Sequence, residues 1–284
     1  MTRSFLESKI NSVYEDFVDE SWCELNNRDL NVDGYTSLVY QQKYILKYYV
    51  AYFCELYGMY KKYLKKFDGT KLNVLSLGCG SGIDCEALNR VIIDLDLDIN
   101  INYVGVDIVD WSYRPLFTWA TFKLMCISEL TAKDIRNVDL FVFPKSLTEL
   151  DEDILKIIGK LIATSSRKDC IHFLNTYVTD DADDSNRVDG IRQFGVINKK
   201  LKAKGWECLT FPLEYYRIKN CGWLGHSYNF FKLPDEVKPF VEELKDNCNN
   251  HNGSTKCINC DIDFIPIFTS KYLAFNLLGY ERSE

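Results

Sequence analysis

Three closely spaced glycines follow an apolar run. The segment VLSLGCGSG carries Gly78, Gly80 and Gly82 directly before a helical stretch that begins near Asp84. Glycine lets the backbone turn sharply and approach a ligand with no Cβ atom in the way. The next apolar run, INYVGVDIV, contains Asp107 near its end, where a carboxylate can accept hydrogen bonds from both hydroxyls of a ribose. This order of strand, glycine turn, helix, strand and acid predicts a nucleoside-binding unit.

The spacing of the glycines selects among nucleoside ligands. A dinucleotide fold requires G-x-G-x-x-G, with a pyrophosphate at the helix N-terminus. Here the third glycine comes one residue early, and Asp84 places a negative charge where the pyrophosphate would lie. A carboxylate at that position repels phosphate and suits the ammonium group of an amino-acid cofactor. A Walker loop is excluded because no Gly-Lys-Ser/Thr follows.

The elements that position these residues are short apolar runs alternating with helical stretches. The runs are NVLSLG, INYVGVDIV, DLFVFP and CIHFLNTYV, and the clearest crossover helices are Asp151–Ser165 and Arg187–Lys204. Such alternation is typical of a parallel sheet with helices on both faces. We therefore expect a doubly wound α/β fold, with two further strands in CLTFPLEYYRI and SKYLAFNLLGYER.

The glycine turn together with the acid after the second strand resembles class I S-adenosylmethionine-dependent methyltransferases. The resemblance covers roughly Lys71 to Arg282. It implies a Rossmann-like sheet that is mostly parallel with its last strand antiparallel, and an enzyme that uses S-adenosylmethionine. It also implies that the turn lies against the methionyl part of the cofactor and that Asp107 holds the ribose. The expected cofactor-binding residues are Gly78, Cys79, Gly80, Gly82, Asp84, Asp107, Phe143 and Pro144.

The third apolar run, in VDLFVFPKSLTEL, supplies the candidates for catalysis. Ligands of open α/β sheets bind outside the carboxyl ends of the strands, so the residues after this run are placed for the methyl acceptor. Methyl transfer mainly requires alignment, and a neutral acceptor must also lose a proton to a nearby group. We predict catalytic roles for Lys145, Ser146 and Glu149. The alternatives are a solvated lysine and a helix-capping carboxylate.

The ending Ser-x-x-x-Glu-Leu at Ser146 to Leu150 is also weakly similar to a signature of methyltransferase-like ribosome assembly factors. This likeness motivates a second interpretation. In it, the chain is a catalytically inactive binding or assembly module that has kept the methyltransferase fold.

Residues 1–68 are predicted to form an N-terminal helical region ahead of a methyltransferase-like domain at 69–284. Aromatic side chains recur at helical spacing from Tyr40 to Tyr63, and lysines follow at 61, 62, 65 and 66. This pattern favours an amphipathic helix packed on the next domain. The alternative is an aromatic and basic surface for RNA.

A polar loop near the C-terminus contains the spacing C-x-x-H-x(5)-C-x-x-C. Its members are Cys248, His251, Cys257 and Cys260, within an insertion at 221–263. Tetrahedral zinc closes such loops with sulfur and imidazole ligands, so we predict a structural zinc site. Cys221 or His226 replacing one ligand, four free side chains, and an iron–sulfur site are the alternatives.

Composition limits the partners. The 284 residues include 41 acidic and 34 basic side chains, a net charge of −7, which excludes a globally basic nucleic-acid coat. No apolar run approaches the roughly 20 residues needed to cross a bilayer, so we expect a cytoplasmic protein without a membrane partner. RNA, a protein side chain and a small molecule are all compatible as the methyl acceptor. Lysines at 61–66 and 199–204 keep RNA among them.

Overall fold

The computed structural model describes residues 3–17, 34–177, 189–210, 216–217 and 274–283, with a few isolated positions between 239 and 246. The helices are α1 (Arg3–Glu15), η1 (Gly34–Thr36), α3 (Leu38–Leu64), α4 (Ile83–Asp94), η2 (Ile127–Glu129), α5 (Ala132–Ile135), η3 (Leu147–Glu149), α6 (Glu152–Ser165) and α7 (Asp189–Lys202). The strands are β1 (Lys71–Leu77), β2 (Asn100–Asp107), β3 (Ala120–Leu124), β4 (Leu140–Pro144), β5 (Cys170–Tyr177), β6 (Trp206–Cys208), β7 (Tyr216–Arg217) and β8 (Ala274–Arg282).

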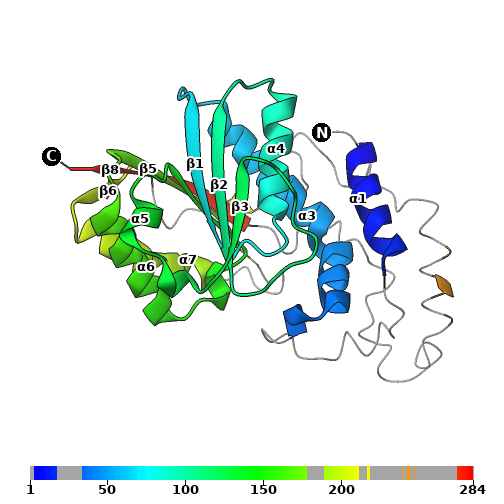
Figure 1. Cartoon of the computed structure of the whole chain (residues 1–284). Helices are drawn as coiled ribbons and strands as arrows, with labels where there is room; N and C mark the ends of the chain where they lie inside the picture. Colours follow the sequence, from blue (N-terminus) through cyan, green and yellow to red (C-terminus); the bar gives the residue numbers. More distant parts are fainter. Residues whose placement is uncertain are drawn as a thin grey trace.

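The described strands form one sheet in the order β3-β2-β1-β4-β5-β8-β6, with β7 paired to β8 (Figure 1). The pairs among β1 to β5 are parallel, and β8 runs antiparallel to β5, β6 and β7. The direction of strand order reverses between β1 and β4, which is the point where ligands of open α/β sheets bind. The predicted α/β class, mostly parallel with its last strand antiparallel, is confirmed.

Helices cover both faces of the sheet, and alternate residues of each strand face opposite layers. Along β1, Val74 belongs to the hydrophobic cluster with α1, α3 and α4, whereas Leu75 belongs to the cluster with α6 and α7. Figure 1 shows α3 and α4 on one side of the sheet and α5, α6 and α7 on the other. The α6 helix begins after Asp151, whose side chain accepts a hydrogen bond from the backbone N–H of Ile154 at 2.8 Å.

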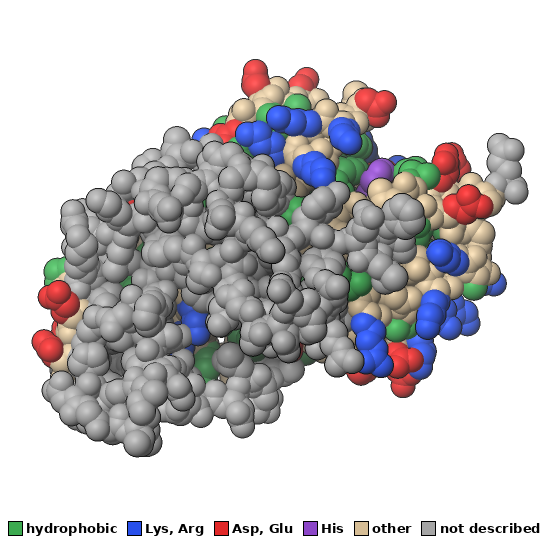
Figure 2. Space-filling view, turned by 180° about the vertical axis from the view of Figure 1, so that it is seen from behind, with side chains coloured by type: hydrophobic (Ala, Val, Ile, Leu, Met, Phe, Trp, Pro, Cys, Tyr) green, Lys and Arg blue, Asp and Glu red, His purple; other side chains and the backbone are tan. Residues whose placement is uncertain are grey.

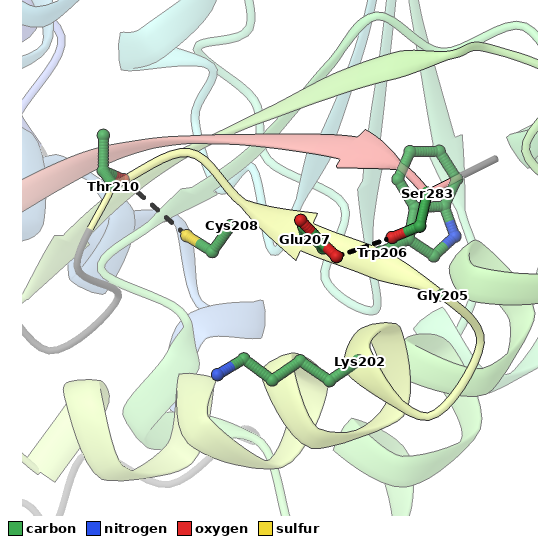
Figure 3. Close-up of a pocket in the computed structure, with 7 residues that line it drawn as sticks. All are labelled: Lys202, Gly205, Trp206, Glu207, Cys208, Thr210 and Ser283. Carbon is green, nitrogen blue, oxygen red and sulfur yellow. Dashed lines mark hydrogen bonds between the residues drawn. The ribbon is translucent and has the colours of Figure 1, made fainter.

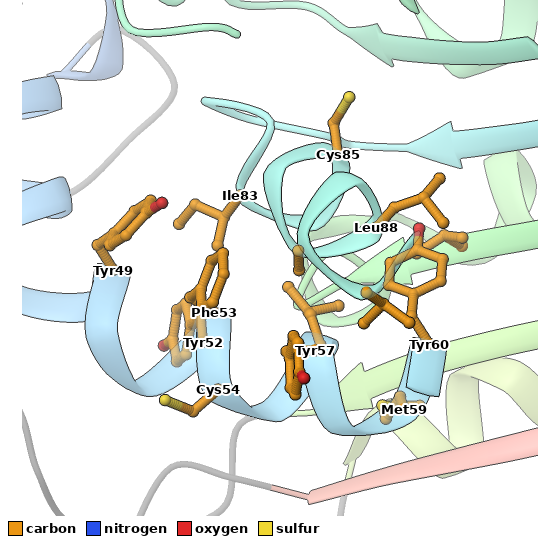
Figure 4. Close-up of a cluster of buried hydrophobic side chains, with 14 of the residues drawn as sticks. Tyr49, Tyr52, Phe53, Cys54, Tyr57, Met59, Tyr60, Ile83, Cys85 and Leu88 are labelled. Carbon is orange, nitrogen blue, oxygen red and sulfur yellow. The ribbon is translucent and has the colours of Figure 1, made fainter. Parts of the chain in front are cut away.

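The long helix α3 is packed against α4 by its aromatic side chains (Figure 4). Phe53 and Tyr57 of α3 and Leu88 of α4 are at most 1% exposed and lie in one hydrophobic cluster. The predicted packing of this amphipathic helix on the following domain is therefore observed. The lysines of its last turn, Lys61 and Lys62, are half-buried, and Lys65 and Lys66, which follow the helix, are exposed. On the described part of the face in Figure 2, groups of basic side chains have acidic side chains around them.

Two features of the sheet differ from the sequence prediction. Strand β3 was not predicted, because its residues are half-buried or exposed and it shows no continuous apolar run. A single strand was predicted over CLTFPLEYYRI, but β6 ends at Cys208 and the two-residue β7 pairs separately with β8.

The predicted insertion at 221–263 lies almost wholly outside the described residues. None of the helices in the described ranges has the length and apolar character needed to span a bilayer.

Candidate functional site

The glycine turn joins β1 to α4 with a backbone that favours glycine. Gly78, Gly80 and Gly82 have φ angles of 70°, 54° and 76°. In this left-handed region a Cβ atom is strained. A Cβ atom added to Gly78 would also lie 2.5 Å from the Cβ of Ser146, so β4 and the turn approach each other closely at this point. The Ser146 hydroxyl donates to the carbonyl of Leu77 at 2.5 Å, which fixes the end of β1 to the end of β4.

Asp107 is held at the carboxyl end of β2, directed at the turn. Its Oδ2 accepts a hydrogen bond from the backbone N–H of Gly80 at 2.7 Å, and its Oδ1 accepts one from Val109 N at 2.9 Å. Each carboxylate oxygen has a second lone pair, so both can accept another hydrogen bond. The carboxylate is therefore oriented in advance and can still bind two hydroxyl groups.

Lys145 follows β4 in a strained backbone conformation. Its φ of 62° is in the left-handed region, which is rare for a residue with a Cβ atom and costs energy. Its N–H donates to Thr176 Oγ1 at 2.9 Å, and its Nζ donates to the carbonyl of Tyr177 at 2.6 Å. Nζ also lies 2.7 Å from Glu55 Oε2, in an ion pair with helix α3. These contacts hold the strained residue in place.

The Glu55–Lys145 pair is buried, with both side chains at most 7% exposed. Burial raises the pKa of Glu55, and the adjacent Lys145 acts against that shift. Burial lowers the pKa of Lys145, and Glu55 acts against that shift. The alternative of a solvated lysine at 145 is therefore wrong.

A cavity of about 420 Å³ opens at this edge of the sheet, within the size range of small-molecule sites. The glycine turn, Asp107 and the residues after β4 contribute to one wall, and tyrosines of η1 and α3 contribute to another. Its described lining residues are Tyr35, Tyr44, Tyr48, Tyr52, Gly78, Gly80, Asp107, Ile108, Val109, Trp111, Cys126, Ile127, Pro144, Lys145, Ser146, Glu149, Leu150 and Ile154.

The cavity brings together most of the residues that the sequence singled out. Of the predicted cofactor-binding and catalytic residues, those that line it are Gly78, Gly80, Asp107, Pro144, Lys145, Ser146 and Glu149. Glu149 is an exposed member of this wall.

Four predicted cofactor-binding residues are not among the lining residues of this cavity. Phe143 is fully buried on the face that packs against α6 and α7, because strand residues alternate between faces. Cys79 Sγ lies against Gly105 of β2, and Gly82 lies against the side chains of Pro115 and Phe122. Asp84, the fourth, is fully buried, and its carboxylate accepts hydrogen bonds from the hydroxyl of Tyr103 at 2.9 Å. Asp84 thus has different surroundings from those expected for a partner of the cofactor's ammonium group.

Asp84 gives a testable pH dependence. Burial raises its pKa from 3.8 to about 6, although the Tyr103 hydrogen bonds oppose the shift. The folded state therefore binds this proton more tightly than the unfolded state. The stabilising contribution is present below pH 3.8 and is lost as the pH rises through about 6. A shift of this size corresponds to about 3 kcal/mol.

We expect the free energy of unfolding of an Asp84→Asn variant, relative to that of wild-type protein, to rise by about 3 kcal/mol as the pH increases from 4 to 7.5. The reason is that the variant has no charge to bury. Urea denaturation at several pH values measures this change. Asp153→Asn, at a side chain that is 85% exposed, is the matched control and should show no such trend. An Asp84→Asn profile parallel to that of the wild type would contradict the burial of a titrating carboxylate.

The functional residues that the sequence did not reveal come mainly from distant parts of the chain. They are Tyr35, Tyr44, Tyr48, Tyr52 and Trp111 in the cavity wall and Glu55 behind Lys145. The four-residue spacing of the α3 tyrosines indicates a shared helix face. It does not indicate what that face contacts.

Two other locations contribute less. A second depression, of about 510 Å³, lies beside β6 and the end of α7 and includes Lys202, Trp206, Glu207 and Ser283 (Figure 3). It is near the starts of the parallel strands, at the opposite end from the glycine turn. Trp206 pairs with Arg282, and the preceding Glu281 pairs with Cys170, the first residue of β5. Among the described residues no group of three or more His, Cys, Asp or Glu side chains is arranged to hold a metal. The predicted zinc ligands Cys248, His251, Cys257 and Cys260 lie outside those residues.

No protein-family model and no curated protein matches this sequence. Similar solved structures include a TehB-like SAM-dependent methyltransferase from Corynebacterium glutamicum, with 12% identity over 79% of this chain and 88% of that one, and a TM-score of 0.41. The plantazolicin methyltransferase BpumL in complex with SAH has 13% identity over 98% and 100%, with a TM-score of 0.46. The methyltransferase domain of bacterial CtHen1-CN has 13% identity over 80% and 97%, with a TM-score of 0.43. The fold class of this chain follows from its own strand order.

Proposed function

We propose that this protein is a methyltransferase that uses S-adenosylmethionine. The observation that carries the proposal is the position of Asp107 beside the glycine turn, where both line one cavity at the reversal of strand order. A carboxylate fixed by backbone N–H groups at the end of β2 suits the two hydroxyls of a ribose. The sequence resemblance to class I methyltransferases gives the same cofactor.

The chemistry of the cavity wall fits an adenosyl amino acid. A Cβ atom added to Gly80 would lie 3.7 Å from the ring of Trp111, which is an ordinary van der Waals distance. The backbone of the turn is therefore accessible at Gly80. Trp111 Nε1 is buried and has no hydrogen-bond partner among the described residues. A buried donor of this kind is costly unless a ligand accepts its hydrogen bond. Apolar side chains of Ile108, Val109 and Ile127 provide a surface for a purine ring.

A dinucleotide is less compatible with the same geometry. Its pyrophosphate would lie on the N-terminus of the helix after the glycine turn. The described cavity lining includes Gly78 and Gly80 but no residue of the first turn of α4. That first turn also carries Asp84, whose buried carboxylate disfavours a phosphate there. These features support an adenosyl amino acid over NAD.

The residues around the cavity divide the work of methyl transfer. When bound, S-adenosylmethionine supplies a methyl carbon activated by positively charged sulfur. Asp107 and the turn hold the nucleoside, and Ser146 fixes the turn through its bond to the carbonyl of Leu77. Lys145 is held by Glu55 and by the carbonyl of Tyr177, so it connects the end of β4 to helix α3 and to the end of β5. Glu149, which is exposed to solvent, accepts the proton that the acceptor loses and passes it to water.

Ligand-dependent thermal unfolding tests this proposal. A ligand present at 100 times its Kd stabilises the folded state by about 2.7 kcal/mol. For a domain of this size that raises the melting temperature by about 5 to 10 °C. We expect such a rise with S-adenosylmethionine and S-adenosylhomocysteine, and none with NAD. A rise with NAD alone would overturn the proposal, and no rise with any of the three would favour a binding module that has lost the cofactor.

A further inference from the structure

Aromatic rings from separate elements line the cavity. Tyr44 and Tyr48 are one helical turn apart on α3, with ring centroids 5.2 Å apart. Trp111, from the loop after β2, lies 5.2 Å from the ring of Tyr44 and 5.4 Å from that of Tyr35. Tyr52 extends the wall, because its ring is stacked on Tyr48 at 5.2 Å and 11°. We call these five residues the aromatic wall.

Carboxylates adjoin the aromatic wall. Glu149 and Asp107 line the same cavity. Burial raises the pKa of Tyr35 to about 12, and the negative charge of Glu149 adds to the shift. Burial also raises the pKa of Tyr44, with smaller contributions from Tyr35, Tyr48, Asp107 and Glu149. These contributions indicate that the tyrosine hydroxyls and the two carboxylates lie near one another.

The positive charge in the described lining is already balanced. Lys145 is the Lys or Arg side chain among those lining residues, and its Nζ is paired with Glu55 at 2.7 Å. The remaining charges of the lining, on Asp107 and Glu149, are negative. Two rings of the aromatic wall already hold lysine cations, because Lys47 Nζ lies 5.2 Å from the centroid of Tyr48 and Lys145 Nζ lies 4.9 Å from that of Tyr52. Aromatic ring faces attract cations through their quadrupole, and carboxylates add to that attraction. The cavity therefore favours a positively charged group over a neutral or anionic one.

We infer that the methyl acceptor is a small organic amine, whose ammonium group binds between the ring of Tyr44 and the carboxylate of Glu149. This inference rests on the proposed function. The ammonium first gives one proton to Glu149, and the freed nitrogen lone pair then forms a bond to the methyl carbon. The carbon–sulfur bond breaks, and its electron pair stays on sulfur. The product is a methylated ammonium and a neutral thioether, and the proton on Glu149 passes to water.

A pair of isosteric probes separates charge from shape. Choline carries a quaternary ammonium that cannot accept a methyl group, and 3,3-dimethylbutan-1-ol is its neutral isostere. Both are titrated calorimetrically into the full chain saturated with S-adenosylhomocysteine. This ligand fills the cofactor region, so choline can bind only in the acceptor region. We expect choline to bind at least about tenfold more tightly than the alcohol, which is within the range of desolvated cation–π contacts.

Variants identify the groups responsible. Glu149→Gln and Tyr44→Leu should reduce the preference for choline to about twofold or less, while Tyr44→Phe, which keeps the ring, should retain it. Glu152→Gln, at an α6 carboxylate that is 69% exposed, is the matched control and should retain the wild-type preference.

Binding of S-adenosylhomocysteine, measured first in each sample, keeps the two proposals apart. If it binds and choline shows no preference over the alcohol, the amine inference is wrong and the methyltransferase proposal stands. Choline is also titrated into the chain without S-adenosylhomocysteine. Binding to this ligand-free chain but not to the saturated one would place the cation in the cofactor region and also overturn the inference. If S-adenosylhomocysteine does not bind, both proposals fail.

Discussion

An Asp107→Ala variant is expected to bind S-adenosylhomocysteine at least about 100-fold more weakly than the wild-type protein, because two hydrogen bonds to a charged carboxylate contribute about 1.5–3 kcal/mol each. The carboxylate is held toward Gly80 by a 2.7 Å hydrogen bond and lines the cavity, so its free lone pairs face the ligand region. Isothermal titration calorimetry measures the loss. Asp110→Ala is the matched control, since that side chain is 81% exposed and should leave the affinity unchanged.

The Asp107 side chain also accepts hydrogen bonds from the chain itself, so the variant needs a second readout. Adenosine and 2′,3′-dideoxyadenosine differ only in the ribose hydroxyls. The wild-type protein should prefer adenosine, and Asp107→Ala should bind the two nucleosides equally. An unchanged preference for adenosine in Asp107→Ala would show that another group holds the ribose.

The second large effect concerns stability. Replacing Glu55 with alanine leaves the ammonium of Lys145 buried without its counter-ion and should lower the free energy of unfolding by about 3–5 kcal/mol. Urea denaturation at pH 7.5 measures this loss. A loss below about 1 kcal/mol would contradict a buried ion pair, because solvent-exposed pairs contribute about that much at most.

The double variant Glu55→Leu, Lys145→Met tests whether the pair itself stabilises the fold. Replacing both charges by apolar side chains of similar size should recover most of the lost stability, since neither partner is then left alone. Glu152→Ala, which disrupts an exposed pair with Lys156, is the control and should change the free energy of unfolding by less than about 1 kcal/mol. If the double variant is as unstable as Glu55→Ala, the loss comes from packing around α3 and not from the unpaired charge.

Much of the fold could be predicted because its strands carry continuous apolar runs. Strands β1, β4 and β5 are buried on both faces, and this produces the pattern that distinguishes them. Strand β3 has no such pattern. It lies at the edge of the sheet, with Leu124 59% exposed, so its sequence resembles that of a loop. Its pairing with β2 is visible only once the sheet is assembled.

The candidate site divides in the same way. Gly78, Gly80 and Asp107 could be predicted because their chemistry depends on local turns at strand ends. Asp84 differed because the sequence gives its position in the first turn of α4 but not the direction of its side chain, which faces Tyr103. Glu55 had one local signal, since it is the only acidic residue of helix α3. Its partner is 90 residues away, and no spacing rule connects them.

The place of β8 has a consequence for how the chain reaches this structure. In sequence β8 is the last of the described strands, but in the sheet it lies between β5 and β6. Its Glu281 pairs with Cys170 of β5. During synthesis β5 and β6 therefore leave the ribosome long before the strand that joins them. Until residues 274–282 follow, the edge of β5 exposes unpaired N–H and C=O groups that another chain can bind. Substitutions that weaken β8 should therefore lower the yield of folded protein and increase its dependence on chaperones, because this pairing is the last in the sheet to form during synthesis.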